Sequence, residues 1–472
     1  MRGLTLSAIA KACGGQLVLG PACDPEAVKQ EITCAVLDSR KVEKGGLFFA
    51  NEGAQVDGHK FIGQVYERGA LLVVCEKNPE TVEKEHGVLA SSWGAYILVD
   101  NTLQALKDIA TFYREQLTIP VVGITGSVGK TSTKEFIASV LAQKYEVLKT
   151  EGNFNNEVGL PLTLLRIQDH HQVAVVEMGI SDFGEMHRLS QMAKPDICVL
   201  TNIGQCHLEN LGTRDGILKA KTEIFDFMAE DGYVCAYGED DKLSTLGKVK
   251  GREVTFFGMS NEFPVYADQI ENKGLFGSEA ILHVMGQMIE VQIPLPGQHM
   301  VVNATAAAAV ANLLGLDMEQ IAQGIESVQA VGGRSHIMAL KDYTLIDDCY
   351  NANPVSMCAA IDLLKMANGR KVAVLGDMFE LGTDSDQMHA RVGAYASEQS
   401  VDVIICVGEN SKHMYDAAAL AKTENQQVQY FATRDEMMAK LPAMLVKGDT
   451  ILVKASHGMG FDQVVGGLSK GK

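Results

Sequence analysis

Strand-like apolar runs alternate with helix-length amphipathic segments along almost the whole chain, and this alternation constrains the fold more than any other feature. Parallel sheets covered by helices produce such a pattern, because a buried parallel strand is apolar on both faces. The sequence therefore predicts an α/β protein. At 472 residues the chain is too long for a single core, and roughly 150 residues per domain suggests about three domains.

The alternation falls into three series of strand candidates. The first predicts a small α/β domain over residues 1–100. The second, over 101–332, predicts a mostly parallel sheet, and its segment 264–295 has short β runs separated by glycines that indicate an antiparallel patch. The third, over 333–472, has its own βαβ rhythm and predicts a Rossmann-like α/β domain.

Composition excludes several classes of protein. The hydrophobic share of 46% and charged share of 21% are typical of globular chains, so wholesale disorder is not expected. The 41 Lys and Arg against 59 Asp and Glu give a formal net charge of -18, which argues against a nucleic-acid partner. No apolar run reaches the roughly 20 residues of a membrane span, and the start of the chain lacks a secretory signal, so a cytoplasmic protein is expected. The ten cysteines form no CxxC pair and are expected to be reduced and mostly buried.

The segment GITGSVGKTS, residues 123–132, lies between an apolar strand candidate and a helix-length stretch. Its glycines and the helix N-terminus can face a phosphate, Lys130 can reach the outer phosphates, and the Thr131 hydroxyl can ligate magnesium. The strict P-loop pattern has glycine where this chain has Ile124, so the match is the shorter GxxGKT, and a glycine-rich turn with a solvated lysine is the alternative. The segment predicts a nucleotide phosphate site formed by Gly126, Ser127, Gly129, Lys130, Thr131 and Ser132.

Two polar side chains follow predicted strands at the sheet edge where α/β proteins bind ligands. Glu177 ends the run VAVVEM, and His207 follows the strand candidate at 197–202. If both converge on the magnesium of a bound nucleotide, they supply the charge compensation that γ-phosphoryl transfer needs. Alone, such a carboxylate can be exposed or cap a helix, and a lone histidine is more often structural. Lys219 and Lys221 lie on a predicted helix, where lysines are solvated by default, and that default is kept for Lys219.

The third region carries candidates for the second half of a nucleotide site. GRSH contains Arg334, whose guanidinium suits phosphate charge, and the turn DDCYNANP contains Asp348 and Asn351 for ribose hydroxyls or base amides. Either segment could also be ordinary turn chemistry. Together they predict that nucleotide contacts are divided between the second and third regions.

In order and spacing, the motifs of this chain resemble those of the Mur ligase family. The series covers nearly the whole chain and runs through TGSVGKTS, NFNNEVGLPLTLL, the Glu177 and His207 strand ends, AKTEIF, GQHMVVNATAAAAVA, GRSH and DDCYNANPVSM. The resemblance implies a three-domain, ATP- and Mg²⁺-dependent amide ligase of bacterial cell-wall synthesis in the cytoplasm. The segments NFNNEVGLPLTLL, YNANP, GDMFELG, DSRKV, GGLFFA and DGHKFI imply that it joins D-alanyl-D-alanine to UDP-N-acetylmuramoyl-tripeptide through an acyl phosphate. We expect a monomer that acts on small molecules.

The resemblance also implies catalytic and metal-binding roles for residues at matching positions. Lys130 and Arg334 would neutralise the transferred phosphoryl group. Magnesium would be organised, directly or through water, by Thr131, Glu177 and His207. Lys221 matches a lysine that is carbamylated in some relatives, and it would join the metal site only in that form.

Further matches imply contacts with nucleotide and substrate. Asn303 would approach the adenine, and Asp348 with Asn351 would face the ribose. The first domain would meet the uridine diphosphate end of the substrate at Ser39 and Arg40. Two amides would line the central cleft, Asn155 and Asn156.

Two alternatives remain open on the sequence. Another Mur-type or folylpolyglutamate-type ligase shares the ATP machinery and differs in the amine it accepts. A P-loop NTPase switch would hydrolyse ATP without either substrate. The chain also departs from the family's pattern at Met300, where relatives often have Asn, and at His457, where Arg is common.

Overall fold

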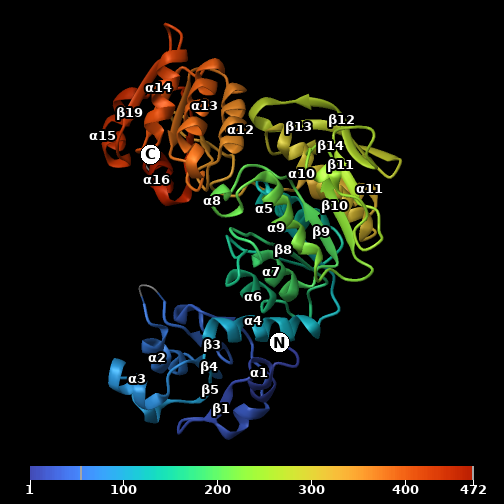
Figure 1. Ribbon diagram of the computed structural model, residues 1–472, viewed down its shortest axis with the longest axis vertical. Coiled ribbons are helices and arrows are strands. Elements are labelled where there is room, and N and C mark those ends of the chain that lie inside the picture. The colour runs from blue at the N-terminus through green and yellow to red at the C-terminus, as the bar shows by residue number, and fades with distance from the viewer. Residues whose placement is uncertain (54–55, 470–472) are drawn as a thin grey trace.

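The computed structural model describes residues 1–53 and 56–469, and its strands form three sheets, one in each predicted region. The predicted α/β class, with a mostly parallel central sheet, is therefore confirmed. Figure 1 shows the N-terminal sheet at one end of the molecule, the large central sheet in the middle and the C-terminal sheet at the other end.

The first sheet has five strands in the order β1-β5-β4-β3-β2, and only the β1–β5 pair is antiparallel. Its strands are β1 (Gln16–Leu19), β2 (Ala35–Val36), β3 (Leu47–Ala50), β4 (Leu72–Cys75) and β5 (Ala95–Leu98). Both faces are covered, since alternate residues of β3 and β4 enter two separate apolar cores. The helices of this region are α1 (Leu6–Cys13), α2 (Ile62–Glu67) and α3 (Pro79–His86).

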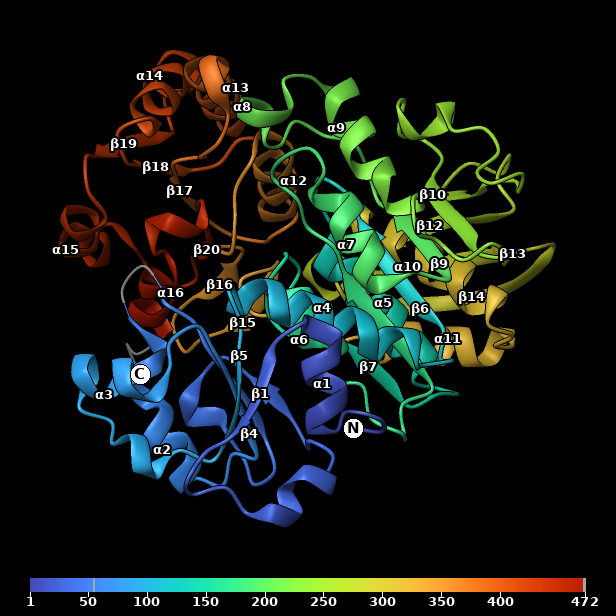
Figure 2. The same cartoon turned by 60° about the horizontal axis from the view of Figure 1, so that its bottom comes forward.

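Helix α4 (Thr102–Glu115) lies between the first sheet and the central region, as both views show (Figure 2). Leu106 and Ile109 are fully buried in a core that continues from the first sheet into the central one. On the central side, Tyr113 donates a 2.6 Å hydrogen bond to the Ile167 carbonyl, and Arg114 donates to the Ala193 carbonyl at 2.8 Å. Helix α4 therefore contributes apolar packing between the two domains.

The central sheet has nine strands in the order β14-β13-β12-β11-β10-β9-β6-β8-β7. All neighbours are parallel except the β12–β13 and β13–β14 pairs, which are the predicted antiparallel patch. The strands are β6 (Val121–Thr125), β7 (Val147–Lys149), β8 (Val173–Glu177), β9 (Ile197–Leu200), β10 (Tyr233–Tyr237), β11 (Thr255–Gly258), β12 (Val265–Asn272), β13 (Ser278–Val284) and β14 (Gln287–Ile293).

Helices cover both faces of the central sheet. One face packs against α5 (Lys130–Leu141), α10 (Gln298–Leu313) and α11 (Met318–Glu326). The other packs against α4, α6 (Gly159–Leu164), α7 (Glu185–Ala193) and α9 (Arg214–Thr222). The alanine-rich helix α10 begins at Gln298, and Met300 and Val301 in its first turns are buried.

The third sheet has the order β15-β16-β20-β17-β18-β19 and is parallel apart from the β15–β16 pair. Its strands are β15 (His336–Ala339), β16 (Thr344–Asp347), β17 (Lys371–Gly376), β18 (Val403–Val407), β19 (Gln427–Phe431) and β20 (Thr450–Lys454). One face packs against α12 (Pro354–Lys365), α13 (Ser385–Glu398) and α14 (Ser411–Ala421), and the other against α15 (Arg434–Met444) and α16 (Asp462–Ser469). Two layers of helices around a parallel sheet match the expected Rossmann-like arrangement.

The proposed domain boundaries fall in connections between elements, after residue 100 between β5 and α4 and after residue 332 between α11 and β15. All ten cysteines are unpaired, and half of them are buried. Within the described residues, no helix combines the length and apolarity required to cross a bilayer.

Candidate active site

A cavity of about 650 Å³ opens between the central and third domains. The P-loop and the ends of β8 and β9 form one wall, and the turn after β16 forms the other. These are carboxyl ends of parallel strands, where open α/β sheets bind ligands. The predicted residues that line this cavity are Ser127, Gly129, Lys130, Thr131, Ser132, Asn155, Asn156, Glu177, His207, Asn303, Arg334, Asp348 and Asn351.

The P-loop joins β6 to α5 in a conformation that requires glycine. Gly126 has a φ of 154°, and a Cβ there would lie 1.9 Å from Thr201 Oγ1. Gly129, with a φ of 86°, precedes α5 and provides no side-chain cap. The first N–H groups of α5 therefore remain available to a phosphate, and the helix dipole favours an anion there. The Lys130 Nζ donates a 2.8 Å hydrogen bond to the Gly126 carbonyl.

The residues that follow β9 brace the P-loop from the neighbouring strand. The Val128 N–H donates to Asn202 Oδ1 at 2.9 Å, and Thr201 Oγ1 donates to the Val128 carbonyl at 2.6 Å. The Ser127 N–H donates to the Asn202 carbonyl at 3.0 Å. The loop is held in shape by the protein itself, so little ordering is left for nucleotide binding to achieve.

Glu177 is a buried carboxylate with neutral partners. It is 1% exposed, its Oε2 accepts a 2.9 Å hydrogen bond from Thr131 Oγ1, and its Oε1 accepts one of 2.9 Å from Asn155 Nδ2. Among residues 1–53 and 56–469, no cationic side chain forms an ion pair with it. Buried charges are normally paired with a counter-charge or a metal, and hard oxygen donors are the ligands that Mg²⁺ prefers. The donor set at this edge of the cavity therefore fits a divalent cation.

His207 stands just before the short helix α8 (Leu208–Leu211) and lines the same cavity. Its Nδ1 lies 2.7 Å from Oε2 of Glu380 in the third domain. Burial lowers the pKa of His207, and the Glu380 carboxylate opposes that shift. The neutral imidazole that burial favours is the form that can bind a metal ion.

The two lysines of α9 have opposite surroundings. Lys219 is exposed, as predicted from the sequence, and its amine lies over the Phe183 ring. Lys221 is only 1% exposed, and burial, assisted by the nearby Lys130 charge, lowers its pKa to about 8. Its amine has no hydrogen-bond partner within the described part of the chain, and it does not line the cavity wall.

In the third domain, Arg334 is held by an aromatic ring rather than by a carboxylate. Its guanidinium lies 4.1 Å from the centre of the Tyr350 ring, which in turn contacts the His457 ring at 5.4 Å. No hydrogen bond of this guanidinium is formed in the part of the chain that the structure describes, so its donors are open to an anionic ligand. Tyr350 was missed by sequence reasoning, although it belongs to the DDCYNANP turn.

A second residue missed from the sequence is Lys454 at the end of β20. It is 2% exposed, its Nζ lies 2.6 Å from Asp348 Oδ2, and it donates to the Asn351 carbonyl at 2.9 Å. The signal was present, because a lysine that ends the apolar run TILVK has the same strand-end position as Glu177.

Several residues that were predicted to contact the nucleotide or the substrate already form hydrogen bonds within the protein. Both carboxylate oxygens of Asp348 are engaged, one by Lys454 and one by the Ser335 N–H at 2.9 Å. Asn303 Oδ1 accepts a 2.9 Å hydrogen bond from Thr133 Oγ1. Asn156 Oδ1 accepts one of the same length from the N–H that begins α6. Their roles toward adenine, ribose and substrate stay predictions.

Ser39 and Arg40 belong to the first domain and do not line the interdomain cavity. Ser39 is buried, and the exposed Arg40 forms two 2.9 Å hydrogen bonds with Asp38. These bonds lower the pKa of Asp38 to about 2. The contact of Ser39 and Arg40 with uridine diphosphate stays a prediction.

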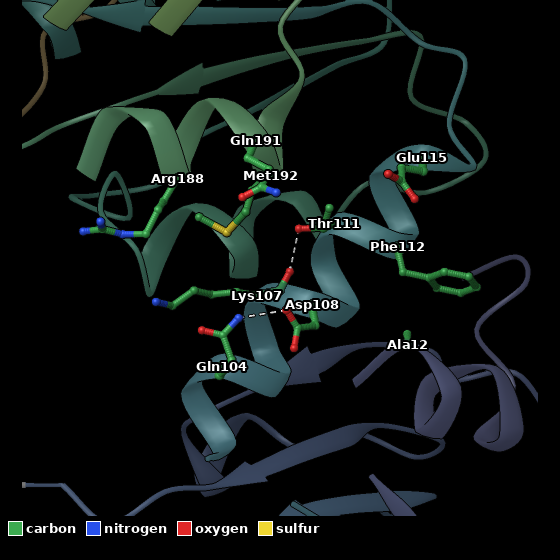
Figure 3. A pocket seen from close by; sticks show the side chains of 10 residues that line it. All are labelled: Ala12, Gln104, Lys107, Asp108, Thr111, Phe112, Glu115, Arg188, Gln191 and Met192. Carbon is green, nitrogen blue, oxygen red and sulfur yellow. Dashed lines mark hydrogen bonds between the residues drawn. The ribbon is translucent and has the colours of Figure 1, made fainter. Parts of the chain in front are cut away.

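A second cavity of about 340 Å³ lies beside α4 and α7 (Figure 3). Several of its polar side chains already have partners: Gln104 donates to Asp108 at 2.8 Å, and Lys107 and Arg188 both pair with Glu157, which lies outside the lining. It contains none of the predicted site residues, so we assign the chemistry to the larger cavity.

Comparison with known proteins supports one family over the whole chain. Three family models match, described as Mur ligase family, catalytic domain (residues 31–114), Mur ligase middle domain (124–311) and Mur ligase, glutamate ligase domain (333–457). The UDP-N-acetylmuramoyl-tripeptide–D-alanyl-D-alanine ligase of Bacillus subtilis is 35% identical over 95% of this chain and 96% of its own. The enzyme of that name from Escherichia coli is 31% identical over 100% and 99%.

Solved structures agree with the sequence comparison. MurF from Acinetobacter baumannii superposes with a TM-score of 0.85 at 32% identity, covering 99% of both chains. MurF ligase from Thermotoga maritima in complex with ADP gives a TM-score of 0.77 at 28% identity, covering 93% of this chain and 97% of its own. The chain therefore belongs to the Mur ligase family.

Proposed function

We propose that this protein joins D-alanyl-D-alanine to the terminal carboxylate of UDP-N-acetylmuramoyl-tripeptide, converting ATP to ADP and phosphate in peptidoglycan precursor synthesis. The observation that carries the proposal is the single cavity in which Lys130, Glu177 and Arg334 meet from two domains. The printed activity of relatives aligned over nearly the whole chain supports the choice of substrates.

The first step activates the carboxylate, which is a poor acyl donor because oxide is a bad leaving group. A carboxylate oxygen attacks the γ-phosphorus of ATP, the bond to ADP breaks, and an acyl phosphate forms. Two anions approach one another in this step, so Lys130, Arg334 and the N-terminus of α5 stabilise the charge on the transferred group. Thr131, Glu177 and His207 would hold magnesium, which when bound neutralises phosphate charge.

The second step forms the amide bond. The neutral amine of D-alanyl-D-alanine attacks the acyl carbon, a tetrahedral intermediate forms, phosphate leaves and the nitrogen loses its proton. Water would hydrolyse the acyl phosphate, so the walls of the interdomain cavity serve to exclude it.

The proposal includes a carbamylated Lys221 as a further member of the metal site. Its burial and its pKa of about 8 support this, because only a neutral amine reacts with carbon dioxide. We also propose that the enzyme is cytoplasmic and monomeric and that its substrates are small molecules.

Phosphate release measured with each combination of substrates tests the proposed function. We expect release from ATP only when UDP-N-acetylmuramoyl-tripeptide and D-alanyl-D-alanine are both present, with a ligated product of matching amount. Release without either substrate would indicate an NTPase switch. Ligation of single amino acids in place of the dipeptide would indicate another ligase of the same family.

A further inference from the structure

The loop after β17 reaches from the third domain to a histidine of the central domain. Oε2 of Glu380 in this loop lies 2.7 Å from Nδ1 of His207. His207 lines the interdomain cavity and Glu380 does not. The carboxylate contacts the ring at Nδ1. No hydrogen bond to Nε2 is formed among the described residues, so Nε2 remains for a ligand.

The backbone at both residues adopts a conformation that side-chain-bearing residues rarely occupy. His207 has a φ of 50° and Glu380 a φ of 61°. Such left-handed residues cost free energy and persist where the surrounding structure requires them, often at functional sites. Two of them facing one another across a domain boundary indicate that this contact is built into both loops.

Apolar packing beside the pair keeps the two loops together. Leu208, which follows His207, packs against the core of the third domain, and that core contains Met378 and Leu381 from the Glu380 loop. Leu381 is 4% exposed and Met378 is 1% exposed. Helix α8 accordingly lies against the turn at Gly382–Asp384 that begins α13.

We propose that Glu380 is a positioning residue of the catalytic centre, an inference that rests on the proposed function. Its carboxylate accepts the Nδ1–H of His207, which sets the tautomer and the ring orientation and leaves the Nε2 lone pair for the metal–nucleotide site. Carboxylates behind metal-binding histidines act in this way, and their removal typically weakens metal affinity. Because Glu380 belongs to the third domain, the metal site is complete only when that domain is docked.

Magnesium-dependent ADP binding to the full-length protein, measured by titration calorimetry, tests the proposal. We expect Glu380→Ala to raise the magnesium concentration needed for tight ADP binding by about tenfold, the lower end of such effects. ADP binding without magnesium should be unchanged. Glu380→Gln should lose less, because its amide oxygen still accepts the Nδ1–H. The matched control is Glu409→Ala, which removes an exposed glutamate of the same domain and should leave both titrations unchanged.

A double-variant cycle identifies the route of the effect. If Glu380 acts through His207, adding Glu380→Ala to His207→Ala should cause no further loss of magnesium dependence. Wild-type magnesium dependence in Glu380→Ala would overturn the proposal. So would a weakened dependence accompanied by altered domain spacing in solution scattering, because loss of docking rather than loss of ring orientation would then explain it. The titration needs neither tripeptide nor dipeptide, so failure of the proposed ligation would leave its result interpretable.

Discussion

At the residue scale, the cavity contains two charged side chains, Glu177 and Arg334, that form no ion pair with any of the described residues. Glu177 is buried between a hydroxyl and an amide, and Arg334 lies against an aromatic ring. A buried carboxylate such as Glu177 is unfavourable for folding when unpaired, and a ligand with phosphates and a cation gives both Glu177 and Arg334 a partner at once. The site is thus prepared for a metal-bound nucleotide before one arrives.

Lys130→Ala tests the phosphate site. The substitution removes the cation closest to the turn of the P-loop, and we expect ligation to fall by at least roughly 100-fold. Among the described residues the side chain makes one hydrogen bond, to the Gly126 carbonyl, so the melting temperature should change little. Phosphate release and a thermal melt measure the two effects.

The matched control for that variant is Lys219→Ala, which removes an exposed lysine of α9. It should keep wild-type turnover. Wild-type turnover in Lys130→Ala would contradict the phosphate site.

Lys221 gives a prediction about pH. Its pKa of about 8 lies below the ordinary 10.5 because burial disfavours the charged amine. The neutral, reactive fraction therefore rises as pH increases from 7 to 9, whereas an ordinary lysine remains charged over that range. With ¹³C-labelled carbon dioxide held at constant concentration, we expect a carbamate signal that grows through about pH 8.

Lys221→Met should lose that carbamate signal, while signals from the chain terminus remain. A spectrum of the wild-type protein identical to that of Lys221→Met at every pH would rule the modification out.

At the scale of elements, the five strands that sequence analysis did not identify all lie at sheet edges. They are β1, β2, β7, β15 and β19. An edge strand has one neighbour and is partly exposed, so it needs no continuous apolar run; β7 reads VLK and β19 reads QVQYF. Strands β6 and β8 have two neighbours each and are buried along their whole length, so their continuous apolar runs marked them in the sequence.

Helix α5, which begins with the P-loop lysine, packs closely against α11 at a glycine. Gly324 of α11 approaches α5 so closely that a Cβ there would lie 2.3 Å from the Val140 Cα. Gly324→Ala should therefore separate the two helices and destabilise the central domain by about 1–3 kcal/mol. Calorimetry should show its unfolding transition at a lower temperature.

Gly466→Ala is the control for that substitution, because Gly466 is also helical and no atom lies within 4 Å of the added Cβ. It should be neutral or stabilising by up to about 1 kcal/mol, since alanine favours helix over glycine. Equal unfolding temperatures of the Gly324→Ala and wild-type proteins would show that α5 and α11 can move apart without loss of stability.

At the scale of the whole molecule, the two walls of the cavity belong to different cores. The P-loop stands on the central sheet, and Arg334 and Lys454 stand on the third. Between these cores, Leu208 and Leu275 of the central domain pack against the third-domain core. Small apolar contacts of this kind permit relative motion of domains.

We expect the domains to close when substrates bind, because an acyl phosphate must be shielded from water. Small-angle scattering should show a smaller radius of gyration with an ATP analogue plus UDP-N-acetylmuramoyl-tripeptide than without them. D-alanyl-D-alanine alone, as the control, should leave the curve unchanged. Identical interdomain distances with and without the two ligands would contradict closure.

The order of apolar runs and motifs by itself determined the α/β class, the antiparallel patch, the P-loop between a strand and a helix, and the family resemblance. These follow from local chemistry, since burial selects apolar strands and phosphate binding selects glycine beside lysine. Only the tertiary structure decided that Glu177 has neutral partners, Thr131 and Asn155, and that Lys221 is buried while Lys219 is exposed. It also decided that Tyr350, Lys454 and Glu380 contact Arg334, Asp348 and His207. Such pairings join residues far apart in the chain, and their energies depend on distance and burial, which exist only once the domains have packed.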